Sequence, residues 1–184
     1  MSSLAHEHGI YTGFDEVQTG MGGTGRPFYI DHLDLPYPPQ ALTVAKKCGV
    51  GVLFMLDHLR DVGVLDSTWG GPLVDMVRAV QEIKIVRKEK LVENAAVCGD
   101  LLVRGLLDLE EEYPDCICNI RGLGFLQGFT PLPVNESRAR NLLLDIALKR
   151  SRLLMLAAGT HSIRLRPNLS TNRDDVNLFL ELLK

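Results

Sequence analysis

An apolar stripe at helical spacing in the second half of the chain is the feature that most constrains the fold. Its members recur every three or four residues and so share one face of a helix that Tyr113 and Pro114 end: Leu91, Ala95, Cys98, Leu102, Leu106 and Leu109. Such a helix must bury its apolar face against another layer. Other segments supply that layer, with strands expected near 117–121, 123–129, 153–156 and 162–166 and helices near 136–150 and from Asp174. The second half therefore predicts a small α+β unit, in the order strand-strand-helix-strand-strand-helix.

The first seventy residues have a different character, irregular and rich in glycine. Residues 10–14 predict a short buried strand after a helix end at His8-Gly9, and residues 41–45 predict a second strand. The glycines between 20 and 25 predict a loop, and a helix is expected from Pro72. These strands are too few to make an α/β sheet by themselves.

Composition excludes several classes of protein. The chain has 184 residues, of which 46% are hydrophobic and 23% charged, as in ordinary globular domains. A net charge of −3 gives no basic surface for nucleic acid, and the longest uncharged stretch, 122–135, is too short to span a membrane. We therefore expect neither partner. The residues from Met1 to His8 do not predict a signal peptide, and the four cysteines do not suggest a disulfide framework.

Two short segments carry side chains suited to chemistry at the ends of the predicted strands. Asp15 ends the first strand, where ligands bind in open α/β sheets, and its carboxylate could hold a cationic ring nitrogen while Gln18 donates to an oxygen of the same ligand. Lys46 ends the second strand, where partial desolvation would make its amine a Schiff-base nucleophile. The alternative for Asp15 is an acidic turn that only ends the strand, and the alternative for Lys46 is a solvated dibasic pair with Lys47.

Two further segments suit anionic ligands. Residues 67–71, which include Thr68, offer hydroxyls and backbone amides for a phosphate before a helix; the alternative is a helix cap beside a core tryptophan. Arg164 and Arg166 share one face of a predicted strand, where one of them could bind a carboxylate through two hydrogen bonds; the alternative is a half-exposed strand edge.

Taken in order, these segments resemble the C-terminal part of class-III pyridoxal-phosphate aminotransferases. The resemblance runs from about His8 to the C-terminus, and its strongest pieces are Phe14-Asp15-Glu16-Val17-Gln18-Thr19-Gly20, Gly23-Thr24-Gly25, Ala45-Lys46-Lys47, Ser67-Thr68-Trp69-Gly70, Asn119-Ile120-Arg121-Gly122-Leu123-Gly124 and Ile163-Arg164-Leu165-Arg166-Pro167. It implies an α/β fold, the C-terminal fragment of a fold-type I transferase. Residues 1–88 would form part of the cofactor-binding large domain and the start of a connecting helix, and residues 89–184 the small α+β domain.

The resemblance also implies roles. Asp15 would pair with the ring nitrogen of pyridoxal 5'-phosphate, Gln18 would approach its phenolic oxygen, and Lys46 would be the catalytic lysine that holds the cofactor covalently and shuttles a proton. Lys46 is preferred to Lys47 because the family lysine follows a small residue. Thr68 would reach the cofactor phosphate of the neighbouring subunit, which implies a homodimer, and Arg164 would bind a substrate carboxylate.

Substrate and activity are less constrained. The family implies amino-acid and 2-oxo-acid substrates. Residues 67–71 and 75–78 resemble the lysine 6-aminotransferases, whereas 106–114 and 177–180 resemble the 4-aminobutyrate enzymes, which we favour.

The family's larger half lies upstream of Asp15, so we expect these 184 residues alone to be inactive. The alternative is a non-catalytic remnant that binds a full-length subunit, with apolar surface exposed on its first half. By the same resemblance, the protein would be located in the mitochondrial matrix or the cytoplasm.

Metal binding by His6, His8, Cys116 and Cys118 is a further alternative that we do not favour. Cys116 and Cys118 lack the two-residue spacer usual in zinc sites, and the two histidines stand at a chain end. No metal is therefore expected.

Overall fold

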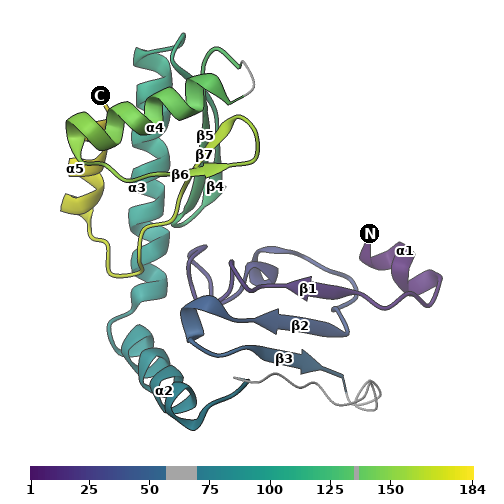
Figure 1. Cartoon of the computed structure of the whole chain (residues 1–184). Helices are drawn as coiled ribbons and strands as arrows, with labels where there is room; N and C mark the ends of the chain where they lie inside the picture. The colour runs from purple at the N-terminus through teal and green to yellow at the C-terminus, as the bar shows by residue number, and fades with distance from the viewer. Residues whose placement is uncertain (57–69, 135–136) are drawn as a thin grey trace. The chain divides into compact units, whose positions relative to one another are not determined.

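The computed structural model describes residues 1–56, 70–134 and 137–184 (Figure 1). The chain divides into two compact units. Unit 1 comprises Met1–Gly22 and Arg26–Lys90, and unit 2 comprises Gly23–Gly25 and Leu91–Lys184.

Unit 1 is built on a three-stranded sheet in the order β1-β2-β3. β1 (Gly13–Asp15) pairs parallel with β2 (Ala41–Val44), and β2 pairs antiparallel with β3 (Val52–Met55). Helix α1 (Ser2–Glu7) precedes β1, the 3-10 helix η1 (Tyr29–His32) lies between β1 and β2, η2 (Lys46–Cys48) follows β2, and α2 (Leu73–Lys88) completes the unit. The carboxyl ends of β1 and β2 therefore lie at one edge of this sheet.

The sheet of unit 1 corrects two expectations. The strand predicted over residues 10–14 forms only at Gly13–Asp15 and is not buried, with Ile10 and Tyr11 60% and 66% exposed. The described residues of unit 1 cover β1 only in part, so these side chains meet solvent. The sequence reasoning also missed β3, a four-residue apolar run that follows Gly51.

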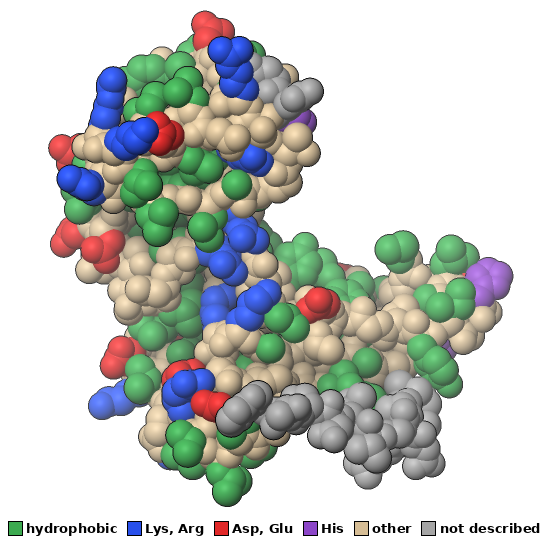
Figure 2. All heavy atoms as spheres, viewed as in Figure 1, with side chains coloured by type: hydrophobic (Ala, Val, Ile, Leu, Met, Phe, Trp, Pro, Cys, Tyr) green, Lys and Arg blue, Asp and Glu red, His purple; other side chains and the backbone are tan. Residues whose placement is uncertain are grey.

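Helix α2 carries its apolar residues mostly on the surface. Leu73 and Val74 are each 80% exposed, and Ala79 is the buried residue of the helix. Hydrophobic side chains accordingly gather over α2 in Figure 2. The predicted helix is confirmed, but the described residues leave its apolar side uncovered.

Unit 2 contains the hydrophobic core. Helix α3 (Leu91–Glu112) buries the predicted stripe from Ala95 to Leu109, together with Phe129 and Ile163 from the sheet. The sheet has the order β4-β5-β7-β6 with antiparallel neighbours throughout: β4 (Ile117–Leu123), β5 (Leu126–Pro131), β6 (Leu156–Ala158) and β7 (Ser162–Leu165). Helices α4 (Arg138–Ser151) and α5 (Arg173–Leu183) complete the helical layer. The predicted α+β order of strands and helices is confirmed.

Local signals explain two boundaries in unit 2. The Asn172 side chain caps α5 by accepting hydrogen bonds from the amides of Asp174 (2.8 Å) and Asp175 (3.0 Å). Gly99 of α3 lies against the turn at Gly124, where a side chain at Gly99 would come within 2.4 Å of the Gly124 backbone. This contact requires glycine at position 99.

Candidate active site

Asp15 and Lys46 stand at the same edge of the sheet in unit 1. In the parallel pairing of β1 with β2, Asp15 lies opposite Thr43, three residues before Lys46. Neighbouring strands are about 4.8 Å apart, so residues just beyond the two carboxyl ends are close in space. The pairing of β1 with β2 thus brings together a carboxylate and an amine that are 31 positions apart in the sequence.

The Asp15 carboxylate is exposed and held in place from two sides. Its Oδ1 accepts hydrogen bonds from the Val17 amide (2.9 Å) and the Thr43 hydroxyl (3.3 Å). Asp15 also lines a cavity of about 540 Å³ beside β1. The carboxylate is therefore oriented while remaining accessible to a cationic partner.

Lys46 begins η2 with an unusual backbone conformation. Its φ is +54°, in the left-handed region that non-glycine residues rarely adopt, whereas Ala45 before it is extended. Such strained positions cluster at functional sites and persist where the surroundings impose them. The side chain is exposed, so the described residues do not supply the desolvated setting expected from the sequence.

Lys47 differs from Lys46 in its contacts. Its Nζ donates a hydrogen bond to the backbone carbonyl of Gln18 over 3.0 Å. The bond ties the residue after Lys46 to the turn that follows β1 and places half-buried Gln18 near η2. Gln18 thus belongs to the same cluster as Asp15 and Lys46.

The sequence reasoning missed a structural role for Glu16. This side chain is 1% exposed, and its carboxylate accepts hydrogen bonds from the Tyr29 amide (3.0 Å), the Ile30 amide (2.7 Å) and the Thr19 hydroxyl. A buried carboxylate needs such donors. Glu16 therefore fixes the turn after Asp15 to η1, and the acidic pair that it forms with Asp15 in the sequence gave no sign of which carboxylate is buried.

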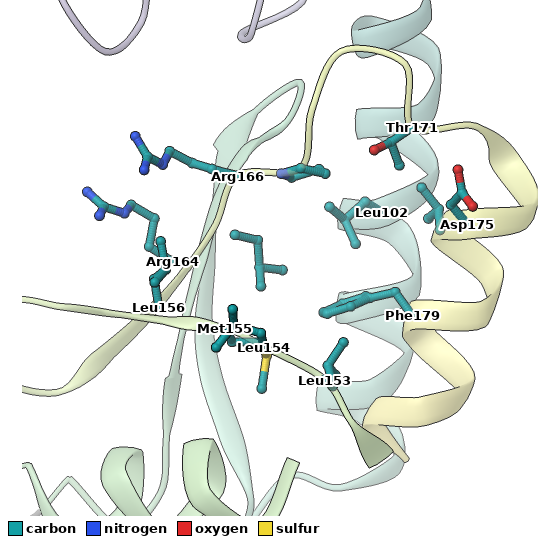
Figure 3. A pocket seen from close by; sticks show the side chains of 13 residues that line it. Leu102, Leu153, Leu154, Met155, Leu156, Arg164, Arg166, Thr171, Asp175 and Phe179 are labelled. Carbon is teal, nitrogen blue, oxygen red and sulfur yellow. The ribbon is translucent and has the colours of Figure 1, made fainter. Parts of the chain in front are cut away.

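Arg164 lies in unit 2, on β7. Buried Ile163 and Leu165 flank it, so its side chain takes the opposite face of the strand. In Figure 3 both Arg164 and Arg166 point away from Leu102 and Phe179, at one side of an apolar cavity of about 300 Å³. The shared face predicted for the two arginines is seen here. Thr68, by contrast, lies outside the described residues.

The remaining candidates form no metal centre in the described ranges. Within residues 1–56, 70–134 and 137–184, His, Cys, Asp and Glu form no group of three that could hold a metal ion. His6 instead stacks on Tyr37, with ring centroids 3.7 Å apart. Among the same residues, no helix combines the length and apolarity needed to cross a membrane.

The chemistry of the unit 1 cluster fits pyridoxal phosphate at the ring. An oriented, accessible carboxylate suits a protonated pyridine nitrogen, and an accessible amine at the same sheet edge suits an aldehyde carbon. The Asp15 carboxylate and the Lys46 amine are thus the two groups that the ring nitrogen and the aldehyde of such a cofactor require.

Comparisons with known proteins identify the same family. A family model for class-III aminotransferases matches residues 1–184. The chain is 34% identical over 185 residues to mitochondrial 4-aminobutyrate aminotransferase of Sus scrofa, covering 99% of this chain and 36% of that protein. It is 32% identical over 185 residues to L-lysine-epsilon aminotransferase of Mycobacterium tuberculosis, covering 96% and 40% respectively.

A solved structure agrees with the sequence matches. Lysine aminotransferase from Mycobacterium tuberculosis superimposes with a TM-score of 0.90 at 30% identity, over 100% of this chain and 42% of that one. The chain spans about two fifths of the length of these relatives. The match over the whole chain shows that it belongs to the class-III aminotransferases, a family of pyridoxal-phosphate-dependent transferases with the fold-type I architecture.

Proposed function

We propose that this 184-residue chain supplies one side of the active site of an aminotransferase that moves an amino group from 4-aminobutyrate to 2-oxoglutarate. The observation that carries the proposal is the register of β1 with β2, in which Asp15 lies opposite Thr43 and so stands at the same sheet edge as Lys46. Family membership adds the cofactor class to this geometry.

Each residue has a separate task. Bound pyridoxal phosphate supplies the electron sink for breaking a bond at the amino-bearing carbon. The Asp15 carboxylate would pair with the ring nitrogen and keep it protonated, and the Gln18 side chain would lie near the phenolic oxygen. The Lys46 amine would hold the cofactor and afterwards move a proton to or from the substrate carbon. Arg164 binds a substrate carboxylate through its planar guanidinium.

The proposal extends to the assembly. Thr68 would contact the cofactor phosphate of a neighbouring subunit, so we propose a homodimer. Asp15 and Lys46 are exposed in the described structure, and residues beyond this chain would be needed to enclose them. We therefore propose that the 184 residues by themselves turn over little or no substrate. The relatives named as mitochondrial support the mitochondrial matrix, with the cytoplasm as the alternative.

Lysine is the second candidate donor. The chain superimposes on 42% of a lysine aminotransferase with a TM-score of 0.90, and its residues 75–78 resemble the lysine enzymes. The features around residues 106–114 favour 4-aminobutyrate instead. A remnant that only binds a full-length subunit is the third candidate, and the exposed apolar side chains of α2 support it.

A half-reaction separates the three candidates. The chain loaded with pyridoxal phosphate is mixed with 4-aminobutyrate or L-lysine, and the loss of the cofactor's aldehyde-state absorbance is followed, with Lys46→Ala as control. A faster loss with 4-aminobutyrate supports the first candidate, and a faster loss with lysine replaces it by the second. If neither donor changes the absorbance, the assay is repeated with an added full-length relative whose own catalytic lysine is replaced by alanine; co-purification of the two proteins without any reaction would establish the remnant.

A further inference from the structure

Unit 2 contains a further cavity, of about 380 Å³, that the candidate active site does not use. It lies where the C-terminal ends of α3 and α5 meet one side of α4, and residues of β4 and β5 complete its lining. Asp15, Lys46 and Arg164 are not among the lining residues. The volume falls within the range of about 300–1,000 Å³ that is usual for small-molecule sites.

Both the buried and the exposed parts of the lining are apolar. Leu109 of α3 and Ile117 of β4 are buried and belong to the hydrophobic core. Leu142 and Ile146, one turn apart on α4, and Tyr113 after α3 are exposed to solvent instead, Leu142 to 59%. Covering such surface is favourable by about 25 cal/mol for each Å² removed from water. The lining therefore favours a ligand with a hydrocarbon body.

Hydrogen bonds join the elements around this cavity. The Leu132 amide, just after β5, donates to the Cys116 carbonyl just before β4 over 2.7 Å. The Lys184 Nζ, just after α5, donates to the Glu112 carboxylate at the end of α3 over 3.0 Å. The cavity is thus a pre-formed feature of unit 2, as ligand sites usually are. Because Lys184 already pairs with a carboxylate, it offers a ligand little net positive charge.

The charged side chains at the cavity have one sign. Among the described residues that line it, the charged ones are Arg138 and Lys184, and none is a carboxylate. Arg138 begins α4 and is exposed, and among the described residues no acceptor lies within hydrogen-bond distance of its guanidinium. This group can form two parallel hydrogen bonds with a carboxylate, while its methylene stem extends the apolar lining. Arg138 therefore suits an anionic head group.

We propose that this cavity binds a medium-chain aliphatic monocarboxylate, whose hydrocarbon chain contacts the apolar lining and whose carboxylate pairs with Arg138. The lining distinguishes this ligand from two others. An aliphatic amine would meet Arg138 as a like charge, and a short carboxylate such as acetate would leave Leu142 and Ile146 exposed. The inference does not rest on the proposed function, because the cavity contains none of the groups assigned to the cofactor.

Binding of octanoate to the full chain tests the proposal. Amide resonances of the isotopically labelled 184-residue chain are titrated, without cofactor, with butanoate, hexanoate and octanoate, each below its micellar concentration. Each further methylene group that is buried should tighten binding about fourfold. The resonances that shift should include those of Ile117 and Leu143, which line the cavity.

Substitutions on α4 separate the ionic from the apolar contribution. Arg138→Gln should weaken octanoate binding about tenfold and change the binding of uncharged octan-1-ol less than about twofold. Leu142→Asn should weaken both ligands, because it removes part of the apolar wall. Arg150→Gln, in the last turn of the same helix and outside the lining, is the matched control and should change neither. All three positions are exposed, and circular dichroism checks that each variant is folded.

Four results would overturn the proposal. Equal affinities for butanoate and octanoate would show that charge alone holds the ligand. Equal weakening by Arg138→Gln and Arg150→Gln would show a non-specific attraction to α4. Octanoate that shifts no resonance of the cavity lining, or that does not bind at all, would exclude the site. Failure of cofactor labelling at Lys46 would count against the proposed function alone, because these titrations contain no cofactor.

Discussion

Thr43 lies opposite Asp15 in the parallel register of β1 and β2, and its hydroxyl donates a hydrogen bond to Asp15 Oδ1 over 3.3 Å. The same strand then leads through Ala45 to Lys46, whose backbone takes a left-handed conformation. One strand therefore both orients the carboxylate and delivers the amine.

Asp15→Asn removes the charge of the site while keeping an oxygen for the Val17 and Thr43 bonds. If the carboxylate pairs with a protonated ring nitrogen, the affinity for pyridoxal phosphate should fall by about 10- to 100-fold, the equivalent of one charged hydrogen bond. Glu89→Gln, which changes an exposed carboxylate of the same unit away from the cavity that Asp15 lines, is the control and should bind the cofactor like the unaltered chain. Equilibrium dialysis measures both, and equal affinities for the two variants would remove Asp15 from the site.

Glu16→Ala should destabilise unit 1 without touching the cofactor groups. The substitution leaves the Tyr29 and Ile30 amides and the Thr19 hydroxyl without their acceptor, and it should lower the free energy of unfolding by about 3 kcal/mol. Glu16→Gln keeps one oxygen and should cost less. Urea denaturation followed by circular dichroism checks the order; a Gln variant as unstable as the Ala variant would argue against hydrogen bonding as the cause.

Gly99→Ala and Gly105→Ala offer a matched pair on one helix. A Cβ at Gly99 would lie 2.4 Å from the Gly124 backbone, whereas one at Gly105 would meet the Cδ1, Cδ2 and Cγ atoms of Leu180, a side chain that can rotate away. We expect Gly99→Ala to lower the melting temperature markedly, at a cost of about 1–3 kcal/mol or more. Gly105→Ala should change the melting temperature little, since alanine also favours the helix. Similar melting temperatures for the two would contradict the close packing at Gly124.

Cys98 predicts a dependence of stability on alkaline pH. Burial raises the pKa of its thiol above the ordinary value of 9.0. Because the folded thiol holds its proton more tightly than the unfolded one, its stabilising contribution is complete below pH 9.0 and is lost as the pH rises through the folded pKa. Unfolding free energies measured from pH 8 to 10 should fall more for the unaltered chain than for Cys98→Ala, and parallel curves would exclude this origin.

The sequence predicted unit 2 well because its helices and strands bury their own apolar faces. The stripe on α3 from Ala95 to Leu109 needs only the sheet of the same unit to be satisfied. Local periodicity therefore matched the tertiary structure, and the helix expected from Asp174 begins at Arg173, after the cap at Asn172.

Unit 1 was harder to predict because its described residues cover its strands only in part, so an apolar run there does not mark a buried strand. Ile10 and Tyr11 look like part of a buried strand, yet they are exposed, and the short run of β3 was missed. The positions of Asp15 and Lys46 on strand ends were predicted from resemblance and spacing, but the buried role of Glu16 depends on η1, thirteen residues away, and no local pattern encodes it.

Borohydride trapping shows whether Lys46 is the residue that holds the cofactor. The chain is incubated with pyridoxal phosphate and reduced, and the labelled peptide is mapped by mass spectrometry, with Lys46→Ala and Lys47→Ala in parallel. We expect one label per chain at Lys46, lost in Lys46→Ala and kept in Lys47→Ala. Labelling spread over surface lysines, or kept in Lys46→Ala, would contradict it.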